Sequence, residues 1–326
     1  MYEIFGLFSI FCMIVVTSVA FVFLVKESIK TKEIKEVDKI MGKEKSSWIL
    51  LAESIIGKSH LKSTPPIPCQ DSHHIQMLDG TWGIAIVSDG LGSKPLSHIG
   101  SQFVAKKTAS KLRKRVKKSE WYHNQKMPTE TEWKAMSYHV LFDVRTSLAL
   151  FSEKNKYKFN DLACTVIAVV FSPHGLLVTH IGDGRAGYRN SAGDWKSMMT
   201  PINGETSSHV MPITGNFWNN KEETEQYVES RVINEPIDVF TLMSDGCENF
   251  SYETINLKGE HVNKPFEGFF EPVVSYFLDE VSLEERNKVW RDFLTNGNEM
   301  IANEPDDKTM IVGILQEEKN HENAER

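Results

Sequence analysis

Apolar residues form short runs in some stretches of this chain and helically spaced patterns in others. Runs rich in Val, Ile, Leu and Phe, bounded by Gly, Pro, Asn or Asp, are typical of strands. They predict strands at 48–56, 74–78, 82–88, 162–171, 176–181, 186–189, 227–233, 239–244 and 309–315. The segment 58–70 contains Pro65, Pro66 and Pro68, so we expect a loop there.

Four other stretches space their apolar residues as a helix does. In the first of them, Ile99, Phe103, Leu112 and Val116 lie roughly on one face. The predicted helices are 97–118, 129–153, 266–278 and 283–301. The polar stretch 198–225 has little periodicity and predicts a long loop or a flap over a site. Helix-rich blocks thus separate runs of strands, which favours an α+β class with helices packed on antiparallel sheets.

The N-terminal residues 4–25 carry no charged side chain and are rich in Phe, Ile, Val and Leu. At ~1.5 Å per residue such a segment is long enough to cross a bilayer as a helix. A cleaved signal peptide would have a basic start, a shorter apolar stretch and a small-residue cleavage site. A buried core helix would not explain the flanking charges. We therefore expect an uncleaved, single-pass transmembrane anchor at 1–25.

Charge on the two sides of this segment predicts its orientation. No Lys or Arg precedes the apolar run, and seven lysines follow within 26–46, interleaved with acidic residues. The positive-inside rule then places the soluble body in the cytoplasm, at the cell inner membrane. We expect 26–46 to be a charged stalk, either a solvated spacer or a segment in contact with anionic lipid.

Composition narrows the remaining possibilities. The chain has 326 residues, of which 40% are hydrophobic, which is enough for one large core or two modest ones. A net charge of −7 gives no support for nucleic-acid binding, and the lysines of 97–118 lack interleaved aromatics, so we interpret them as a solvated face. The four cysteines form no CxxC pair, so neither a thiolate zinc site nor a disulfide framework is expected.

Acidic residues mark the ends of three of the predicted strands. Asp89 ends one run, Asp245 ends another, and Asp306 with Asp307 comes just before a third. The first two are followed by glycine, which lets the backbone turn sharply and approach a ligand closely. Several carboxylates at one rim of a sheet make an oxygen-rich site for a hard cation such as Mg²⁺ or Mn²⁺. This pattern favours metal-assisted hydrolysis over ordinary turn chemistry.

The ordered motifs resemble those of the metal-dependent protein serine/threonine phosphatases of the protein phosphatase 2C type, in particular the bacterial branch. The motifs are Cys69-Gln-Asp71, Val87-Ser-Asp-Gly-Leu-Gly-Ser93, Ala163-Cys-Thr-Val, His180-Ile-Gly-Asp-Gly-Arg185, Met243-Ser-Asp-Gly246 and Asp306-Asp-Lys-Thr309. The resemblance covers residues 47 to 315. It implies a four-layer sandwich of two antiparallel β-sheets flanked by α-helices. The expected domains are therefore the anchor 1–25, the stalk 26–46, a phosphatase domain 47–316 and a disordered tail 317–326.

The resemblance also implies a role for individual residues. Asp89 matches the carboxylate that bridges two metal ions, and Gly90 matches the residue that offers its backbone carbonyl to one of them. Asp245 and Asp306 match the other direct ligands, and Asp71 matches the residue that holds metal-bound water. Catalysis in such a site rests on Asp89, Asp245, Asp306 and Asp71.

Two further aspartates are candidates for other roles in the family pattern. Asp161 is a candidate ligand of a third, weaker metal ion, although the segment after it is shorter than usual. Asp183 lies in the Gly-Asp-x-Arg motif, and there we favour a structural contact behind the sheet. The implied cofactors are two Mg²⁺ or Mn²⁺ ions, with a third as an option.

The activity implied by the resemblance is hydrolysis of phosphoserine or phosphothreonine in proteins, without a phosphoenzyme. Two cations can clamp the phosphate and activate a water molecule, so the protein mainly positions charge. No Cys-x5-Arg sequence is present, which argues against the cysteine-dependent phosphatases. The implied partners are phosphoprotein substrates and an opposing Ser/Thr kinase, with the membrane contacted through residues 4–25 and no nucleic acid.

Two departures from the family pattern concern the substrate side of the site. Many members have a histidine soon after the first Asp-Gly, where this chain has Leu91. That role passes here to water or to another group such as His98, for which we favour a structural role. The family's phosphate-gripping arginine has no match near Pro66. Lys58 or His60 could substitute for it.

Two alternatives to a phosphatase remain open from the sequence. A catalytically weak, membrane-tethered binding or scaffold module could keep the same fold, and the missing His and Arg favour it slightly. The retained Asp89, Asp245 and Asp306 argue against it, because clustered carboxylates are costly to keep without a cation. A metal phosphodiesterase or nuclease is a third reading, but no His-rich ligand set supports it.

Overall fold

The computed structural model describes residues 46–200, 210–257, 260–278 and 282–317. The predicted anchor 1–25, the predicted stalk 26–46 except Ser46, the end of the tail and part of the 198–225 stretch lie outside the described residues. Among the helices that are described, we find none whose length and apolar content would let it cross a bilayer. The expectation of a transmembrane helix therefore remains a sequence-based prediction.

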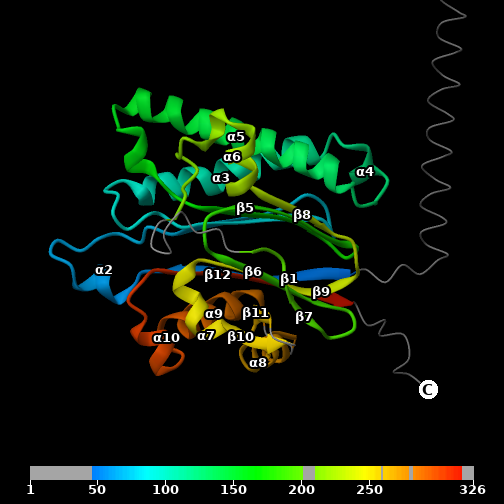
Figure 1. Cartoon of the computed structure of the whole chain (residues 1–326). Helices are drawn as coiled ribbons and strands as arrows, with labels where there is room; N and C mark the ends of the chain where they lie inside the picture. The colour runs from blue at the N-terminus through cyan, green and yellow to red at the C-terminus, as the bar shows by residue number, and fades with distance from the viewer. Residues whose placement is uncertain (1–45, 201–209, 258–259, 279–281, 318–326) are drawn as a thin grey trace, which may run out of the picture. The chain divides into compact units, whose positions relative to one another are not determined.

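The described chain is built on two five-stranded sheets (Figure 1). The first sheet contains, in spatial order, β1 (Ser46–Ile55), β12 (Lys308–Glu317), β9 (Ile237–Met243), β6 (Arg185–Asn190) and β7 (Trp195–Ser197). The second contains β2 (Ser72–Met77), β3 (Gly83–Ser88), β4 (Val166–Ser172), β5 (Gly175–Ile181) and β8 (Glu229–Ile233). Neighbouring strands throughout the second sheet are antiparallel, as are β12–β9, β9–β6 and β6–β7 in the first.

The strand β3 shows how one sequence run serves two cores. Side chains alternate between the faces of a sheet with a period of two. Ile84 and Ile86 accordingly pack in the cluster beneath the helices, and Ala85 and Val87 pack in the cluster between the sheets. All four are buried, which explains why the run is continuously apolar rather than alternating.

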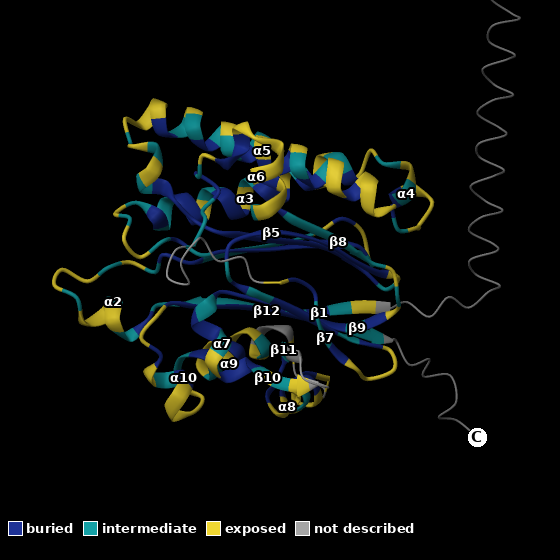
Figure 2. Ribbon diagram, viewed as in Figure 1, coloured by how far each residue is buried: buried dark blue, intermediate teal, exposed yellow. Residues whose placement is uncertain are grey.

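Helices cover the outer face of each sheet, giving four layers (Figure 2). On the second sheet lie α3 (Ser97–Val116) and α5 (Glu130–Asn155), and on the first lie α8 (Glu267–Leu278), α9 (Leu283–Asn296) and α10 (Glu299–Asn303). Capping boxes at Thr129 and Ser282 start α5 and α9, because each side chain and a glutamate three residues later satisfy free backbone N–H groups. The predicted sandwich of antiparallel sheets and helices is confirmed.

Several local expectations were wrong. The segment 58–70 opens with a short helix, α2 (Lys58–Lys62), before its prolines begin. The predicted helix 283–301 is two helices, because Asn298 is extended and its side chain caps the start of α10 by accepting a hydrogen bond from the Ile301 N–H. The hairpin of β10 (Tyr252–Leu257) and β11 (Glu260–Pro265) was missed, because its polar residues give no strand-like apolar run. Within 198–225, the expected loop contains the short helix α6 (Lys221–Tyr227).

Candidate functional site

The strand ends that carry the acidic residues meet at one end of the sandwich. Asp71 immediately precedes β2, Asp89 follows β3, Asp245 follows β9, and Asp306 precedes β12. In the antiparallel pairs, Ser72 lies opposite Ser88 and Met310 opposite Met243, so the start of one strand adjoins the end of its neighbour. Strand pairing therefore gathers residues that are more than 200 positions apart in the sequence.

Three carboxylates lie within reach of a single cation. Asp89, Asp183 and Asp245 each offer an oxygen, and these oxygens all lie within 4.8 Å of one another. Asp183 lies in the turn between β5 and β6, and one of its oxygens, Oδ1, is buried without a hydrogen-bond partner among the described residues. The sequence favoured a structural role for Asp183, but the structure places it with the candidate ligands.

The carboxylates of the centre repel one another in a poorly solvated place. Burial raises the pKa of Asp89 well above its usual range, and repulsion from Asp71, Asp245 and Asp306 raises it further. Burial and then Asp306 raise the pKa of Asp245. Burial and then Asp245 raise the pKa of Asp183 to about 6. Nearby Arg185 lowers the pKa of Asp183 and Asp245 but does not offset the rise, so the ionised carboxylates favour a bound cation.

The Ala163-Cys-Thr-Val motif holds Asp89 in place through backbone and hydroxyl contacts. Thr165 accepts a hydrogen bond from the Asp89 N–H at 3.0 Å, and its own N–H donates to the Asp89 carbonyl at 2.7 Å. The next residue, Gly90, lies so close to Gln70 O and to Ser97 that a side chain would collide with them. Gly90 is thus required by close packing around the acidic centre.

Asp71 is fixed from the opposite sheet. The Ser244 hydroxyl donates to Asp71 Oδ2 at 2.6 Å, and the Thr309 N–H donates to Ser244 Oγ at 3.0 Å. Burial raises the pKa of Asp71 to about 8, although the Ser244 hydrogen bond opposes the shift. Asp71 therefore joins the two sheets at the acidic centre rather than belonging to one of them.

Asp307 ties the connection between β1 and β2 to the site. Its Oδ1 accepts from the Gly57 N–H at 2.7 Å and lies 2.9 Å from His60 Nδ1, and its Oδ2 accepts from the Gln70 N–H at 2.5 Å. An asparagine would offer only one acceptor oxygen to these donors. Both carboxylate oxygens of Asp307 are therefore used to hold the loop between β1 and β2.

The remaining predicted site residues are placed apart from the three-carboxylate group. Asp161 lies in a 3₁₀ turn, and in the described part of the chain its side chain does not belong to that group. His98 lies in the first turn of α3, and among the described residues its side chain forms no hydrogen bond or ion pair. Lys58 and His60 lie on α2, and Asp306 is exposed at the edge of the site.

The donor set fits a hard divalent cation. The converging groups are carboxylates, with no thiolate or imidazole in the three-residue group, and oxygen donors of this kind suit Mg²⁺ or Mn²⁺. The unpartnered Asp183 oxygen and the raised pKa values both indicate that a positive charge is missing there. We conclude that the residues present are suited to hold a metal ion.

A cavity opens beside the acidic centre. It has a volume of about 830 Å³ and begins at Leu91 and Ala163. The Leu91 N–H donates a hydrogen bond to the Ala163 carbonyl at 3.0 Å. Its other walls come from the 211–217 segment and from α6, with Phe217 and Tyr227 among the apolar residues. Lys94 is the basic residue of this lining. The cavity is large enough to receive part of a peptide next to the carboxylates.

Comparison with known proteins identifies this arrangement. The protein phosphatase 2C family model matches residues 56–294, which is more than half of the chain and includes Asp71, Asp89, Asp183 and Asp245. The chain belongs to the protein phosphatase 2C family. The family resemblance seen in the sequence motifs is thereby confirmed. In this phosphatase 2C chain, Leu91 directly follows the first Asp-Gly pair.

Individual relatives agree with this assignment. Serine/threonine-protein phosphatase 3 of Escherichia coli (strain K12) is 27% identical over 142 residues, covering 42% of this chain and 52% of that protein. The chain thus spans about half the length of this curated relative. Similar structures include a bacterial serine phosphatase (TM-score 0.52, 12% identity, 83% and 98% of the two chains) and Stp1 from Staphylococcus aureus (0.51, 13%, 82% and 94%).

The fold also occurs in an animal protein. A sex determining protein of C. elegans is similar with a TM-score of 0.53 and 12% identity, covering 82% of this chain and 65% of that one. At such low identities these likenesses establish the phosphatase 2C fold alone. Function therefore has to be argued from the residues of this chain's own site.

Proposed function

We propose that this chain is a Mg²⁺- or Mn²⁺-dependent phosphatase that hydrolyses phosphoserine and phosphothreonine in proteins. The observation that carries the proposal is the convergence of Asp89, Asp183 and Asp245 within 4.8 Å in a phosphatase 2C chain. Phosphoprotein substrates imply an opposing Ser/Thr kinase. The 830 Å³ cavity beside the carboxylates gives room for the residues that flank a phosphorylated side chain.

The chain's own residues supply binding and orientation. Bound metal ions would neutralise the carboxylates, polarise the phosphoryl group and lower the pKa of water. Asp89, Asp183 and Asp245 would hold the metal, with Gly90 offering its carbonyl and Asp306 at the exposed rim. Thr165, Ser244 and Asp307 keep the segments that carry these groups in register through the hydrogen bonds described above.

The scaffold alternative is not favoured. A module without a metal would retain buried carboxyls with raised pKa values and an unpartnered Asp183 oxygen, both of which oppose folding in the ionised state. A protein freed from metal binding would be stabilised by losing one of these carboxylates, yet this chain retains them all.

Metal dependence is the first expected result. Purified full chain should hydrolyse p-nitrophenyl phosphate and a phosphothreonine peptide with Mn²⁺ or Mg²⁺, and EDTA should reduce the rate by about a hundredfold or more. The rate should return when metal is added back in excess. Equal turnover in EDTA and in Mn²⁺ would contradict the proposed mechanism, and metal binding without turnover would favour the scaffold module.

We further propose that His60 contacts the substrate phosphate in place of the missing arginine. Its Nδ1 is fixed at 2.9 Å from Asp307, and only 12% of its side chain is exposed. Partial desolvation at the rim raises the pKa of Asp306; the Asp307 N–H and the nearby His60 imidazole lower it. His60 thus lies within electrostatic reach of the acidic rim. Lys58, the second candidate, lies near the buried Lys308, and repulsion between the two helps to lower the pKa of Lys308.

Loss of the imidazole should weaken phosphate binding. His60→Ala should raise KM for a phosphothreonine peptide about tenfold and weaken inhibition by inorganic phosphate similarly, because a charge-assisted contact is removed. His60→Arg should retain most of the affinity, and Lys58→Ala serves as the matched control on the same helix. Unchanged KM and phosphate inhibition in His60→Ala would exclude this role.

We also propose that residues 4–25 anchor the chain in the inner membrane, with the phosphatase domain cytoplasmic. The support is the uncharged apolar run and the lysines that follow it. Washing membranes that contain the full chain with about 1 M salt should leave it bound, since salt screens charges but does not extract an apolar helix. Release by salt alone would show that the segment does not span the bilayer.

A further inference from the structure

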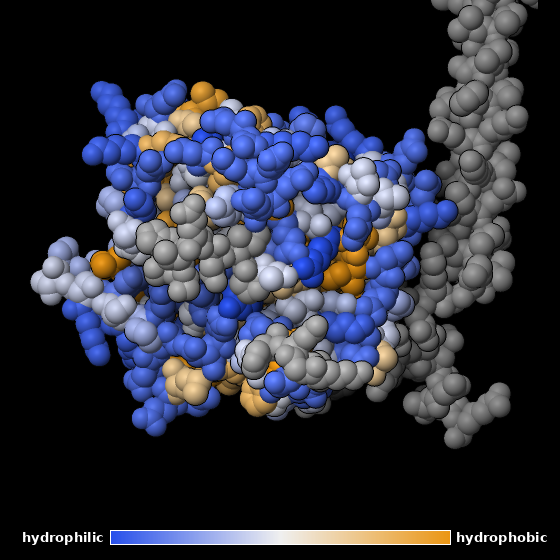
Figure 3. Space-filling view, in the orientation of Figure 1, coloured by the Kyte–Doolittle hydropathy of each residue, from blue (hydrophilic) through white to orange (hydrophobic). Residues whose placement is uncertain are grey.

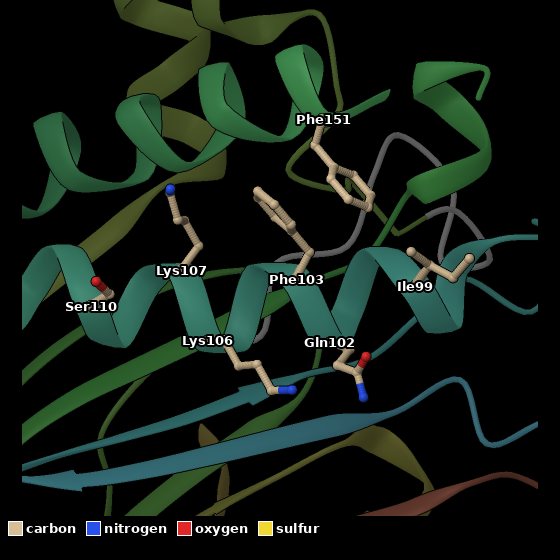
Figure 4. A pocket seen from close by; sticks show the side chains of 7 residues that line it. All are labelled: Ile99, Gln102, Phe103, Lys106, Lys107, Ser110 and Phe151. Atoms are coloured by element: carbon tan, nitrogen blue, oxygen red, sulfur yellow. The ribbon is translucent and has the colours of Figure 1, made fainter. Parts of the chain in front are cut away.

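The exposed side of α3 carries two rows of cations. Lys106 and Arg113 form one row, and Lys107 and Lys114 form the other, since residues 7 apart share a helix face. Lys117 and Lys118 follow in the turn that ends the helix. Figure 4 shows where the rows start, with Lys106 and Lys107 leaving the helix on different sides around a pocket of about 310 Å³. Residues 97–126 contain nine Lys or Arg and one acidic residue, although the whole chain has a net charge of −7.

The cations at the far end of α3 are not neutralised. Two neighbouring basic residues, Lys111 and Arg115, approach Asp143 at 3.7 and 2.9 Å. By contrast, five exposed cations form no ion pair with any described residue. This α3–α4 basic face consists of Arg113, Lys114, Lys117, Lys118 and Lys126. Its strong positive field is suited to an anionic surface.

The α3–α4 basic face adjoins the place where the described chain begins. In β1, Trp48 Nε1 donates to Thr81 O at 2.8 Å. In the same turn, Asp79 Oδ2 accepts a hydrogen bond from the Tyr122 hydroxyl of α4 (Glu120–His123) at 2.8 Å. Next to these contacts, Trp82 Nε1 donates to Gln125 Oε1 at 2.7 Å. The start of β1 and the basic face are therefore at the same end of the sandwich.

The sequence before this point indicates which anionic partner the face meets. The apolar run 4–25 and the charged stalk precede Ser46 directly, so a membrane anchor would bring this end of the domain near a bilayer. We propose that the α3–α4 basic face rests on anionic phospholipid headgroups. Clusters of basic residues close to a membrane anchor bind such surfaces through charge, and salt weakens them. This inference rests on the proposed anchor but not on the phosphatase activity.

The contact would also orient the acidic centre. The ten residues of β1 lead from this end towards Gly57, whose N–H binds Asp307 beside the site. A strand of that length spans roughly 33 Å. An anionic surface attracts the α3–α4 basic face and repels the carboxylates at the opposite end. The site would then open away from the bilayer, where soluble phosphoproteins can reach it. Hydrophilic residues cover most of the side of the domain seen in Figure 3.

Amine labelling of the full chain in nanodiscs tests this inference. One set of discs contains phosphatidylcholine alone and the other contains about 30% phosphatidylglycerol, and acetylation of each lysine is followed by mass spectrometry. In the anionic discs Lys117, Lys118 and Lys126 should react at least about threefold more slowly, and about 0.5 M NaCl should remove the difference. Exposed Lys288 on α9 should react equally in both. Equal labelling of the basic face in both discs would overturn the proposal.

Substitutions separate this contact from its alternatives. The variant Arg113→Gln, Lys114→Gln, Lys117→Gln, Lys118→Gln should lose the lipid-dependent protection of Lys126. The control Lys154→Gln, Lys158→Gln, Lys221→Gln, Lys288→Gln has the same net charge and should keep it. Protection by an added oligonucleotide but not by anionic discs would overturn the lipid assignment in favour of nucleic acid. Failure of the chain to remain with either disc would overturn the anchor, and Mn²⁺-dependent hydrolysis measured on the same discs reports separately on the proposed activity.

Discussion

Asp89→Asn should abolish metal-dependent hydrolysis while making the metal-free protein more stable. The residue lies at the centre of the acidic group, so its loss should reduce turnover by about a thousandfold or more. The same change removes a carboxylate whose pKa is raised by burial and by Asp71, Asp245 and Asp306. With EDTA present, we therefore expect the melting temperature to rise by roughly 2–5 °C. Peptide dephosphorylation and thermal unfolding measure the two effects.

A matched surface variant isolates the cause. Asp292→Asn removes the same charge from an exposed position on α9 and should change neither activity nor melting temperature appreciably. Asp183→Asn should resemble Asp89→Asn if Asp183 contributes to metal binding, and should keep its activity if it is only structural. A fall in metal-free stability together with the loss of activity in Asp89→Asn would instead indicate that the variant misfolds.

Metal-free protein should become less stable as the pH rises from 7 to 8.5, and bound Mg²⁺ should cancel this loss. Burial raises the folded-state pKa of Asp71 to about 8, above the value of an unfolded aspartate near 4. Between these values the folded state binds the extra proton, so its stabilising effect is complete at low pH and disappears as pH rises through about 8. We expect a decrease of about 1 kcal/mol, or roughly 2–4 °C, between pH 7 and 8.5.

Thermal unfolding at several pH values, with EDTA and with Mg²⁺, measures this slope. Because a dication favours ionised carboxylates, the stabilisation by Mg²⁺ should be larger at pH 8.5 than at pH 7. Asp71→Asn should make the slope in EDTA smaller, since one of the titrating carboxyls is gone. Metal-free stability that increases over this interval would contradict the sign derived from Asp71.

Much of the architecture could be predicted from local patterns. Apolar runs of β-branched residues gave the strands β3, β4 and β5, and helical spacing gave α3 and α5, because burial on these faces dominates the choice of residues. The polar hairpin β10–β11 could not be predicted this way. Its strands pair with each other at one side of the first sheet and carry no continuous apolar face.

The site residues likewise divide into those that local motifs predict and those that only the structure brings together. The Asp-Gly turns predicted Asp89 and Asp245, because a glycine after a strand is a local signal. Asp183 also lies in an Asp-Gly turn, yet only the tertiary structure places it beside those two carboxylates. Nor does the sequence indicate that Asp307 accepts hydrogen bonds from Gly57 and Gln70, since both partners are more than 230 residues away.

The family, the strand and helix content and most of the acidic residues could be predicted from the sequence alone, because these depend on short motifs and on the periodicity of burial. Which aspartates meet, and which donors hold them, depends on the tertiary structure. So does the placement of the α3–α4 basic face at the end of the sandwich where β1 begins. Such features depend on strand pairing between distant segments, and strand pairing is fixed only when both sheets and their helices pack together.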